Sequence, residues 1–413
     1  MKYLIERYNK TNTLAVISSY PEKNSTYSRK VCAVGGFTKN TLKFINDKKV
    51  VFTVKISKKE EVYEENKTLV LRVLDRENPL SIFPLINYVC KFNKIKNFLI
   101  EFEFGSFGNI GAVSAFLIVP LILKLFGKKQ TFVIHQVISN LGSIAGHLGW
   151  TVNDLRISIF NTFIRLFYKY IYFLAATTVV TEQYLKNNLK KIIGNERKIK
   201  VIPHGVDTNL RLQDKENSRN ILKLPKDKFI ILYFGYLTWY KGADIFQEYA
   251  KKFKRNKKIL FVMAGGKSFT NKKKKHYQEY LDKFVGKPKN LIISGFVPED
   301  EIGLYFSAAD LVVAPYRVMM SSSGPISLAF SCEKPFILSQ PLVRYFESWD
   351  FVDALRQTGL RKEDFLFDLN QENFEKRLEW AKKNLDKLAN FSRIIKEKRS
   401  WIKIAKLYEK LLE

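Results

Sequence analysis

The stretch Lys228-Phe229-Ile230-Ile231-Leu232-Tyr233-Phe234-Gly235 is followed by a polar loop and then by Lys241-Gly242. The apolar run has the length and the residue types of a buried strand, and it ends in a glycine. We expect a helix to begin near Gly242. A buried strand, a glycine turn and a helix together form the repeating unit of a parallel sheet covered by helices.

The same unit recurs on both sides of this stretch. Further strands are expected at residues 259–264, 290–294, 311–315 and 335–338, and earlier ones at 14–18, 50–55, 68–74, 98–104, 131–137, 177–181 and 200–203. Strands separated by helices imply parallel βαβ units, and the pattern restarts after residue 207. The sequence therefore predicts two open α/β domains, and ligands bind such sheets at the carboxyl ends of the strands. Two such domains imply a ligand cleft between them.

Two familiar nucleotide-binding patterns are absent from the sequence. No G-x-G-x-x-G follows the first strand, and no G-x-x-x-x-G-K-[ST] is present. These absences disfavour a simple dehydrogenase and a P-loop ATPase. The tail places Trp401, Ile404 and Tyr408 on one face, which predicts an amphipathic docking helix.

The charge balance is unusual: 70 Lys and Arg against 40 Asp and Glu give a net charge of +30. A protein this basic attracts nucleic acid, anionic lipid or phosphorylated substrates. The alternative is a genome whose base composition favours Lys and Asn codons, because the lysines are scattered along the chain. We expect no nucleic-acid partner, since no helix-turn-helix, zinc or RNP signature is present.

The three cysteines, Cys32, Cys90 and Cys332, lie too far apart for metal-ligand spacing or a disulfide framework. This pattern fits a reducing compartment, and four histidines cannot supply a rich metal site. The N-terminal residues lack the apolar stretch of a signal peptide. We therefore expect a cytoplasmic location and no metal.

Two apolar segments are candidates for membrane contact. A single helix is expected over residues 110–125, and its apolar run at 110–123 is too short for a span, which needs about 20 residues. Residues 157–180 contain Arg165 and Lys169, which fall with Ser158, Asn161 and Thr162 on one polar stripe. We expect a helix buried on most sides, including at Phe160, Phe163, Ile164, Phe167, Tyr170, Ile171 and Phe173. The alternative is a helix that lies on a membrane surface.

A set of short motifs runs in order along the chain. They are ISSYP (17–21), GGFT (35–38), EFGSFG (103–108), IH (134–135), VIPHGVD (201–207), FGYLTWYKG (234–242), MAGG (263–266), SGFVP (294–298), YFSAADLVVAP (305–315), SSGPISLA (322–329) and KP (334–335). Each motif alone is weak, but the ordered set resembles the retaining GT-B glycosyltransferases of family four, also called glycosyl transferases group 1. EFGSFG resembles the E-F-G-x-F-G of one subgroup.

The resemblance implies a GT-B fold of two doubly wound, Rossmann-like parallel-sheet domains facing a cleft. The first would span residues 1–207 on the acceptor side, and the second would span 208–395 and bind the nucleotide sugar. Residues 396–413 would return to the first domain as a helix. The implied enzyme is a hexosyltransferase that needs no cofactor and uses a nucleotide-diphosphate sugar as substrate. Its acceptor would be a glycan or lipid-linked molecule of envelope polysaccharide assembly, reached by peripheral binding to the anionic inner face of the cytoplasmic membrane.

The resemblance also implies donor-binding residues. Lys241 stands at the Lys of the family's G-R-L-x-x-x-K-G loop, although Tyr236 replaces the Arg. Because Lys241 precedes a helix, its ammonium and the helix N-terminus can both neutralise a leaving diphosphate. The alternative is a surface lysine. Ser322, Ser323 and Gly324 open the next candidate helix, where free N–H groups can hold a phosphate in addition to forming an ordinary N-cap.

The candidate catalytic residues lie in the first domain. His135 would contact the donor sugar, and Glu103 would position the acceptor or accept its proton. The alternatives are a core histidine for His135 and a structural carboxylate for Glu103. Gly35 and Gly36 would let the backbone approach the donor, although they could also form only the turn that begins a helix.

Besides Tyr236, the sequence departs from the family at two more positions. Many relatives carry E-x7-E where this chain has Met320 and Leu328, neither of which can accept a hydrogen bond as a carboxylate does. The alternative function is therefore a sugar-nucleotide-binding GT-B protein that has lost catalysis.

Overall fold

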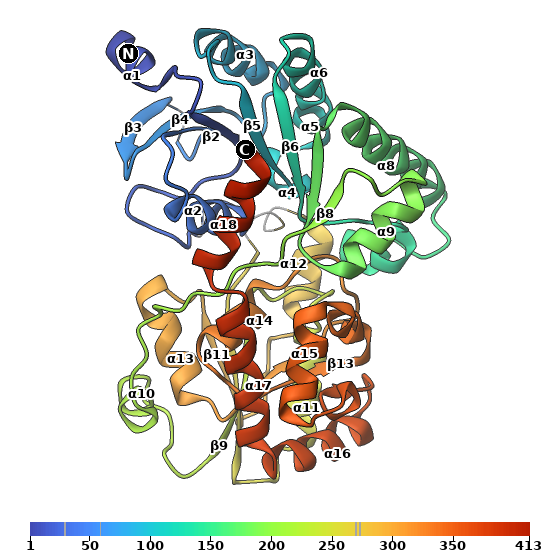
Figure 1. The fold of residues 1–413 in the computed structure, drawn as a ribbon. Coiled ribbons are helices and arrows are strands. Elements are labelled where there is room, and N and C mark those ends of the chain that lie inside the picture. The colour runs from blue at the N-terminus through green and yellow to red at the C-terminus, as the bar shows by residue number, and fades with distance from the viewer. Residues whose placement is uncertain (29, 58, 269–270, 272–273) are drawn as a thin grey trace. The chain divides into compact units, whose positions relative to one another are not determined.

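The computed structural model describes residues 1–28, 30–57, 59–268, 271 and 274–413. Its internal contacts divide the chain into two compact units. Figure 1 shows the chain coloured by residue number from the N-terminus to the C-terminus. The first unit consists of Met1–Ser139, Phe160–Gly205 and Trp401–Glu413, and the second consists of Asn140–Ile159 and Val206–Ser400. The last helix of the chain thus belongs to the first unit.

The first unit contains an eight-stranded sheet in the order β3-β4-β2-β1-β5-β6-β7-β8. Its strands are β1 (Leu14–Ile17), β2 (Lys49–Val54), β3 (Glu61–Glu65), β4 (Thr68–Leu74), β5 (Asn97–Phe102), β6 (Lys129–Ile134), β7 (Thr177–Val180) and β8 (Ile199–Val201). All neighbours pair in parallel except β3, which pairs antiparallel with β4. The predicted strands of this half are confirmed, and β3 is an addition that its charged sequence did not indicate.

Helices cover both faces of this sheet. They are α1 (Lys2–Tyr8), α2 (Val34–Lys43), η1 (Pro79–Ser81), α3 (Ile82–Lys91), α4 (Phe104–Phe107), α5 (Ile110–Phe116), α6 (Ile118–Leu125), most of α8 (Leu155–Leu174), α9 (Gln183–Ile193) and α18 (Trp401–Leu412). Alternate residues of each strand face opposite sides, so two separate cores form. One core packs α3, α5, α6, α8 and α9 against the sheet, and the other packs α2 and α18.

Two expectations about the apolar helices are wrong. The segment expected as one helix from residue 110 divides into α5 and α6, because Pro120 has no N–H to donate to the carbonyl of Phe116. Helix α8 is buried along one face only, through Phe167 and Ile171, since it forms a single layer on the sheet. Phe163 and Phe173 are exposed. Among the described residues, no helix combines the length and apolarity needed to cross a bilayer.

The second unit contains a six-stranded, all-parallel sheet in the order β11-β10-β9-β12-β13-β14. Its strands are β9 (Phe229–Phe234), β10 (Ile259–Ala264), β11 (Leu291–Gly295), β12 (Leu311–Ala314), β13 (Phe336–Ser339) and β14 (Leu366–Phe367). Its helices are η2 (Leu141–Ile144), α7 (Ala145–Leu148), α10 (Lys215–Ile221), α11 (Ala243–Lys252), α12 (Lys275–Asp282), η3 (Glu299–Glu301), α13 (Ile302–Ala308), α14 (Gly324–Ser331), η4 (Gln340–Glu347), α15 (Trp349–Thr358), η5 (Lys362–Asp364), α16 (Gln371–Lys382) and α17 (Leu385–Lys398).

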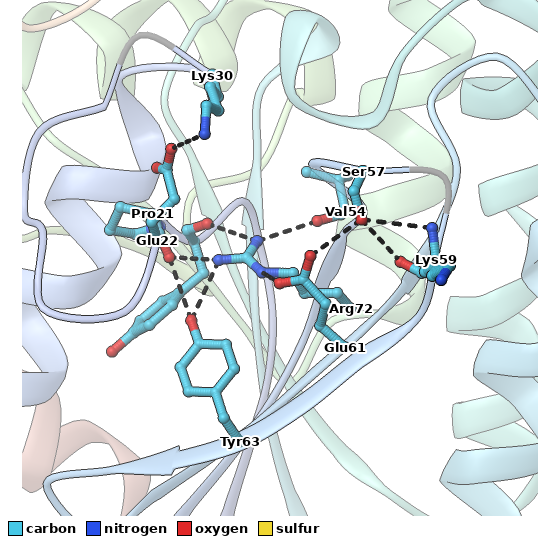
Figure 2. A network of polar contacts seen from close by, with 10 residues as sticks. Pro21, Glu22, Lys30, Val54, Ser57, Lys59, Glu61, Tyr63 and Arg72 are labelled. Carbon is cyan, nitrogen blue, oxygen red and sulfur yellow. Dashed lines mark hydrogen bonds and ion pairs between the residues drawn. The ribbon is translucent and has the colours of Figure 1, made fainter.

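A buried arginine holds the loop that follows β1. Arg72 lies on β4 with no exposed surface. Figure 2 shows its guanidinium donating hydrogen bonds to the carbonyl oxygens of Pro21 and Val54 and to the hydroxyl of Tyr63. The guanidinium also donates to the carbonyl oxygen of Tyr20. An ion pair with Glu61, at 3.5 Å, supplies the counter-charge. One side chain thus satisfies the carbonyl group at the end of β2 and two carbonyl groups in the loop after β1, and it fixes the start of the loop that leads to α2.

We predict that Arg72→Met lowers the free energy of unfolding by about 2–4 kcal/mol, because buried carbonyl groups lose their donors. Glu61→Gln, which removes only the partner of a half-exposed ion pair, should cost about 1 kcal/mol or less. Urea unfolding of both variants measures the difference. Equal losses in the two variants would contradict a special role for the buried guanidinium.

Candidate functional site

His135 follows β6 directly and is bonded to a fully buried carboxylate. The register of β5 and β6 pairs Phe102 with Ile134, which brings the two strand ends together. Oε2 of Glu101, on β5, lies 2.6 Å from Nε2 of His135. Burial raises the pKa of the Glu101 carboxyl, and the adjacent imidazole opposes this shift. Sequence reasoning missed Glu101, although an acidic residue inside the apolar run 98–102 was a usable signal.

Aromatic rings hold the imidazole of His135 in place. The ring of Phe37 meets His135 edge-on, with centroids 4.6 Å apart, and it also meets Trp401 at 5.2 Å. Edge-to-face packing at such distances is the favoured geometry of aromatic pairs. Because Phe37 comes directly after Gly36, the structure brings the glycine pair of α2 and His135 into one cluster.

Glu103 belongs to the same cluster. It occupies the N-cap position of the short helix α4, and its carboxylate accepts a hydrogen bond from the amide of Gln136 at 2.9 Å. Gln136 is the neighbour of His135 in the chain. The structure therefore places Glu103 against the residue that follows His135, and the partly buried carboxylate has a structural partner there.

Gly35 and Gly36 lie in the first turn of α2 and are buried. Their N–H groups donate to the carbonyl oxygens of Cys32 and Ala33. A Cβ on Gly36 would lie 3.1 Å from the carbonyl oxygen of Thr26. These contacts explain the glycine pair as close packing of the preceding loop, and a donor contact at these residues stays a prediction.

In the second unit, Lys241 is buried in a tight turn before α11. Its Nζ lies 5.8 Å from the ring centre of Tyr240 and 5.9 Å from that of Tyr316. Gly242 follows with φ +67°, and a Cβ there would lie 1.9 Å from the carbonyl oxygen of Pro315. Only glycine fits this position, and the backbone turn at Gly242 fixes where Lys241 sits. The interpretation of Lys241 as an ordinary surface lysine is therefore wrong.

Lys241 and the N-terminus of α14 converge on Gly235. A Cβ built on Gly235 would lie 3.0 Å from Nζ of Lys241 and 3.0 Å from the ring of Pro325. Tyr316 links the two groups, because its hydroxyl lies 2.8 Å from Oγ of Ser323. The structure thus brings together the lysine and the serine segment that the sequence singled out separately.

Some hydrogen-bonding groups in the first turn of α14 are bonded to other residues of the protein. Ser323 caps the helix by accepting from the N–H of Ile326, and its own N–H donates to the hydroxyl of Tyr345 at 2.7 Å. A Cβ on Gly324 would meet no atom within 4 Å, so space is open there. The turn therefore leaves room for a ligand next to Gly324, two residues after Ser322. Sequence reasoning missed Tyr316 and Tyr345, because a single tyrosine next to an arginine carries no site signal.

An ion pair supports the turn that carries Lys241. Arg317 donates to both carboxylate oxygens of Asp244, at 2.7 and 2.8 Å, and to the carbonyl oxygen of Trp239. Burial alone would raise the pKa of Asp244, but the bonds and the charge of Arg317 outweigh it and lower that pKa. The Arg317–Asp244 pair thus ties the first turn of α11 to the loop that carries Lys241.

Met320 and Leu328, at the positions where many family members carry carboxylates, are both buried. Leu328 lies within α14 and packs in the core of the second unit. Within the described part of the chain, no three His, Cys, Asp or Glu side chains gather as a metal-binding cluster.

A histidine from residues 140–159 adjoins the lysine turn. The ring of His147 meets that of Tyr240 edge-on, with centroids 4.9 Å apart. Burial, followed by the positive charges of Lys274 and His276, lowers the pKa of His147 from 6.5 to about 4. His147 is therefore neutral at pH 7 in the folded protein.

Comparison with known proteins places part of the chain in a family. Residues 214–345 match the family model "Glycosyl transferases group 1". A 125-residue segment is 30% identical to an uncharacterised glycosyltransferase of Methanocaldococcus jannaschii, and a 121-residue segment is 32% identical to the alpha-galactosylglucosyldiacylglycerol synthase of Streptococcus pneumoniae. Each match covers 29% of this chain and 31% of the relative, so the similarity spans about a third of either protein. The chain thus contains a glycosyl transferases group 1 domain.

Solved structures match over nearly the whole chain. Sucrose-phosphate synthase of Thermosynechococcus elongatus has a TM-score of 0.67 at 17% identity, and Anabaena HepE in complex with UDP-glucose has a TM-score of 0.67 at 14% identity. Both matches cover 97% of this chain and 99% of the other. At this identity the likeness establishes the fold, and the predicted GT-B class of two parallel-sheet α/β domains is confirmed.

We predict that the stability of the protein falls as the pH is lowered from 6.5 toward 4, in part through His147. The unfolded chain binds a proton at this residue below pH 6.5, whereas the folded chain binds it only near pH 4. Well above pH 6.5 the residue is neutral in both states and no longer affects the pH dependence. At pH 5 its contribution is on the order of 2 kcal/mol.

His147→Phe keeps a ring against Tyr240 and removes the titration. Urea unfolding at pH 7.5 and pH 5 should show a smaller pH-dependent loss for this variant than for the wild type. Parallel losses in both proteins would show that His147 is not the responsible group.

Proposed function

We propose that this protein is a retaining hexosyltransferase that moves a sugar from a nucleotide-diphosphate donor to a glycan or lipid-linked acceptor of envelope polysaccharide assembly. The family match over residues 214–345 and the GT-B fold support transfer from a nucleotide sugar. The retaining outcome and the E-F-G-x-F-G subgroup are supported by the resemblance of the ordered motifs. No resident cofactor is needed, because the nucleotide sugar is itself the activated substrate.

The observation that carries this proposal is the convergence of Lys241 and the N-terminus of α14 at Gly235. A buried ammonium beside a helix N-terminus is suited to a diphosphate leaving group, since both stabilise negative charge that develops as the sugar–phosphate bond breaks. HepE has been solved with UDP-glucose, which makes a uridine diphosphate sugar the first donor to test.

We assign His135 and Glu103, in the first unit, to the sugar and the acceptor. His135 would hydrogen-bond the sugar or stabilise developing charge, and Glu103 would position the acceptor or take its proton. Glu101 touches neither substrate in this scheme. It would act as a positioning residue that holds the imidazole of His135 in one orientation and one tautomer.

We place the enzyme in the cytoplasm, bound peripherally to the inner face of the cytoplasmic membrane. The net charge of +30 supports attraction to anionic lipid, and one similar protein is named as a synthase of a glycosylated diacylglycerol. A lipid-linked acceptor would be reached at that surface.

The competing function is a sugar-nucleotide-binding protein without catalysis, which the buried Met320 and Leu328 favour. A panel of nucleotide sugars, screened by thermal shift and then assayed for transfer and hydrolysis, separates the two. A stabilising donor that turns over supports the enzyme, because a ligand that binds the folded state raises its melting temperature. A donor that stabilises without any turnover supports the binding protein.

We predict that Lys241→Ala weakens nucleotide-diphosphate binding and transfer at least tenfold, about 1.4 kcal/mol. The loss follows from removing the cation beside Gly235. Lys251→Ala, which removes an exposed lysine from the end of α11, is the matched control and should leave donor kinetics unchanged. Unchanged kinetics in a folded Lys241→Ala protein would refute the diphosphate assignment.

We predict that Glu101→Gln lowers kcat at least tenfold, about 1.4 kcal/mol, and displaces the pH profile of transfer, because the amide cannot hold His135 as the carboxylate does. His135→Ala should lower kcat by about 10²–10⁴-fold. Thermal melts check that both variants fold. If Glu101→Gln loses stability but keeps the wild-type pH profile, the buried pair is structural only.

A further inference from the structure

The outer faces of α6 and α8 in the first unit carry an exposed apolar stripe. Between 44% and 75% of each of six side chains is exposed: Ile118, Leu121 and Leu125 on α6, and Phe163, Leu166 and Phe173 on α8. The residues of each stripe recur at helical spacing, so each helix turns one apolar face to the sheet and another to solvent.

The two stripes belong to neighbouring helices on one face of the sheet. Both helices pack on the same core, and both connect strands that are adjacent in the sheet, β5 to β6 and β6 to β7. The hydroxyl of Tyr170 on α8 donates to the carbonyl oxygen of Leu117 at the start of α6, at 2.7 Å, which places the helices in direct contact. In Figure 1, α6 and α8 lie on the same side of the first sheet.

Such a face is unusual on a soluble protein. Single exposed apolar residues are common, but stripes on two touching helices indicate a surface that meets a partner. Helix α18, on the opposite face of the same sheet, instead buries Trp401, Ile404 and Tyr408.

The charged residues within α6 and α8 all have one sign. No Asp or Glu occurs between Glu103 and Asp154 or between Asp154 and Glu182, a region that includes α5, α6 and α8. Lys124, Arg165 and Lys169 are exposed on the two helices. The face therefore combines apolar side chains with cations and has no anion of its own.

We infer that this face, formed by α6 and α8, docks onto an anionic lipid bilayer, with the apolar residues in the interface and the cations at the headgroups. Helices with apolar residues beside Lys and Arg lie in this way at membrane surfaces. A second copy of the chain is a poor occupant, because two cationic faces would repel each other. The inference deepens the proposed membrane location and does not depend on the transfer reaction.

The experiment is sedimentation of the full chain with vesicles of phosphatidylcholine alone and of phosphatidylcholine with phosphatidylglycerol, at low and high salt. We expect binding to the anionic vesicles that weakens with salt, since salt screens the headgroup attraction. Leu121→Ser with Leu166→Ser should lower vesicle binding at least tenfold. The control is Ile402→Ser with Leu407→Ser, a similarly exposed pair on α18, which should bind as the wild type does.

A charge-matched pair completes the design. Arg165→Glu with Lys169→Glu should abolish binding at low salt, whereas Lys403→Glu with Lys406→Glu, the same charge change on α18, should reduce it only slightly. Light scattering and thermal melts accompany every variant. Wild-type protein that ignores anionic vesicles while binding its donor overturns this inference and leaves the proposed enzyme standing. Equal loss in the α6/α8 and α18 variants, or a dimer that the serine variants dissolve, also overturns it.

Discussion

Parallel pairing of the central strands is the constraint on which both candidate clusters depend. In a parallel sheet every carboxyl end reaches the same edge, so residues that directly follow different strands become neighbours. In the first unit the register of β5 with β6 sets Glu103 beside the His135–Gln136 pair. In the second, the loops after β9 and β12 meet where Gly242 contacts the carbonyl of Pro315.

Close side-chain contacts then hold the residues at the strand ends in defined positions. Gly205 has no side chain, so Trp401 packs against its backbone, where a Cβ would lie 2.1 Å from the indole. Trp401 supports Phe37, which in turn packs against His135, and His135 is bonded to the buried Glu101. The C-terminal helix thus contributes to the surroundings of the histidine through packing.

The helix layers on the two faces of the first sheet differ in what they bury and what they expose. The layer formed by α2 and α18 buries its aromatic residues and supports His135. The layer that contains α6 and α8 covers the other core and exposes apolar side chains and cations to solvent. This asymmetry separates the residues assigned to chemistry from the face assigned to lipid, so each can be altered without the other.

The sequence located the strands along the chain, because apolar runs that end in glycine or in polar loops indicate buried parallel strands without knowledge of their neighbours. It also identified His135, Glu103, Lys241 and the serine segment as residues at strand or helix ends. The surroundings of these residues follow from the three-dimensional packing. Glu101 lies 34 residues from His135, and Tyr345 lies 22 residues from Ser323. The exposed side of α8 depends on how many helix layers cover the sheet. Such contacts arise from register and packing between remote segments, which local periodicity does not encode.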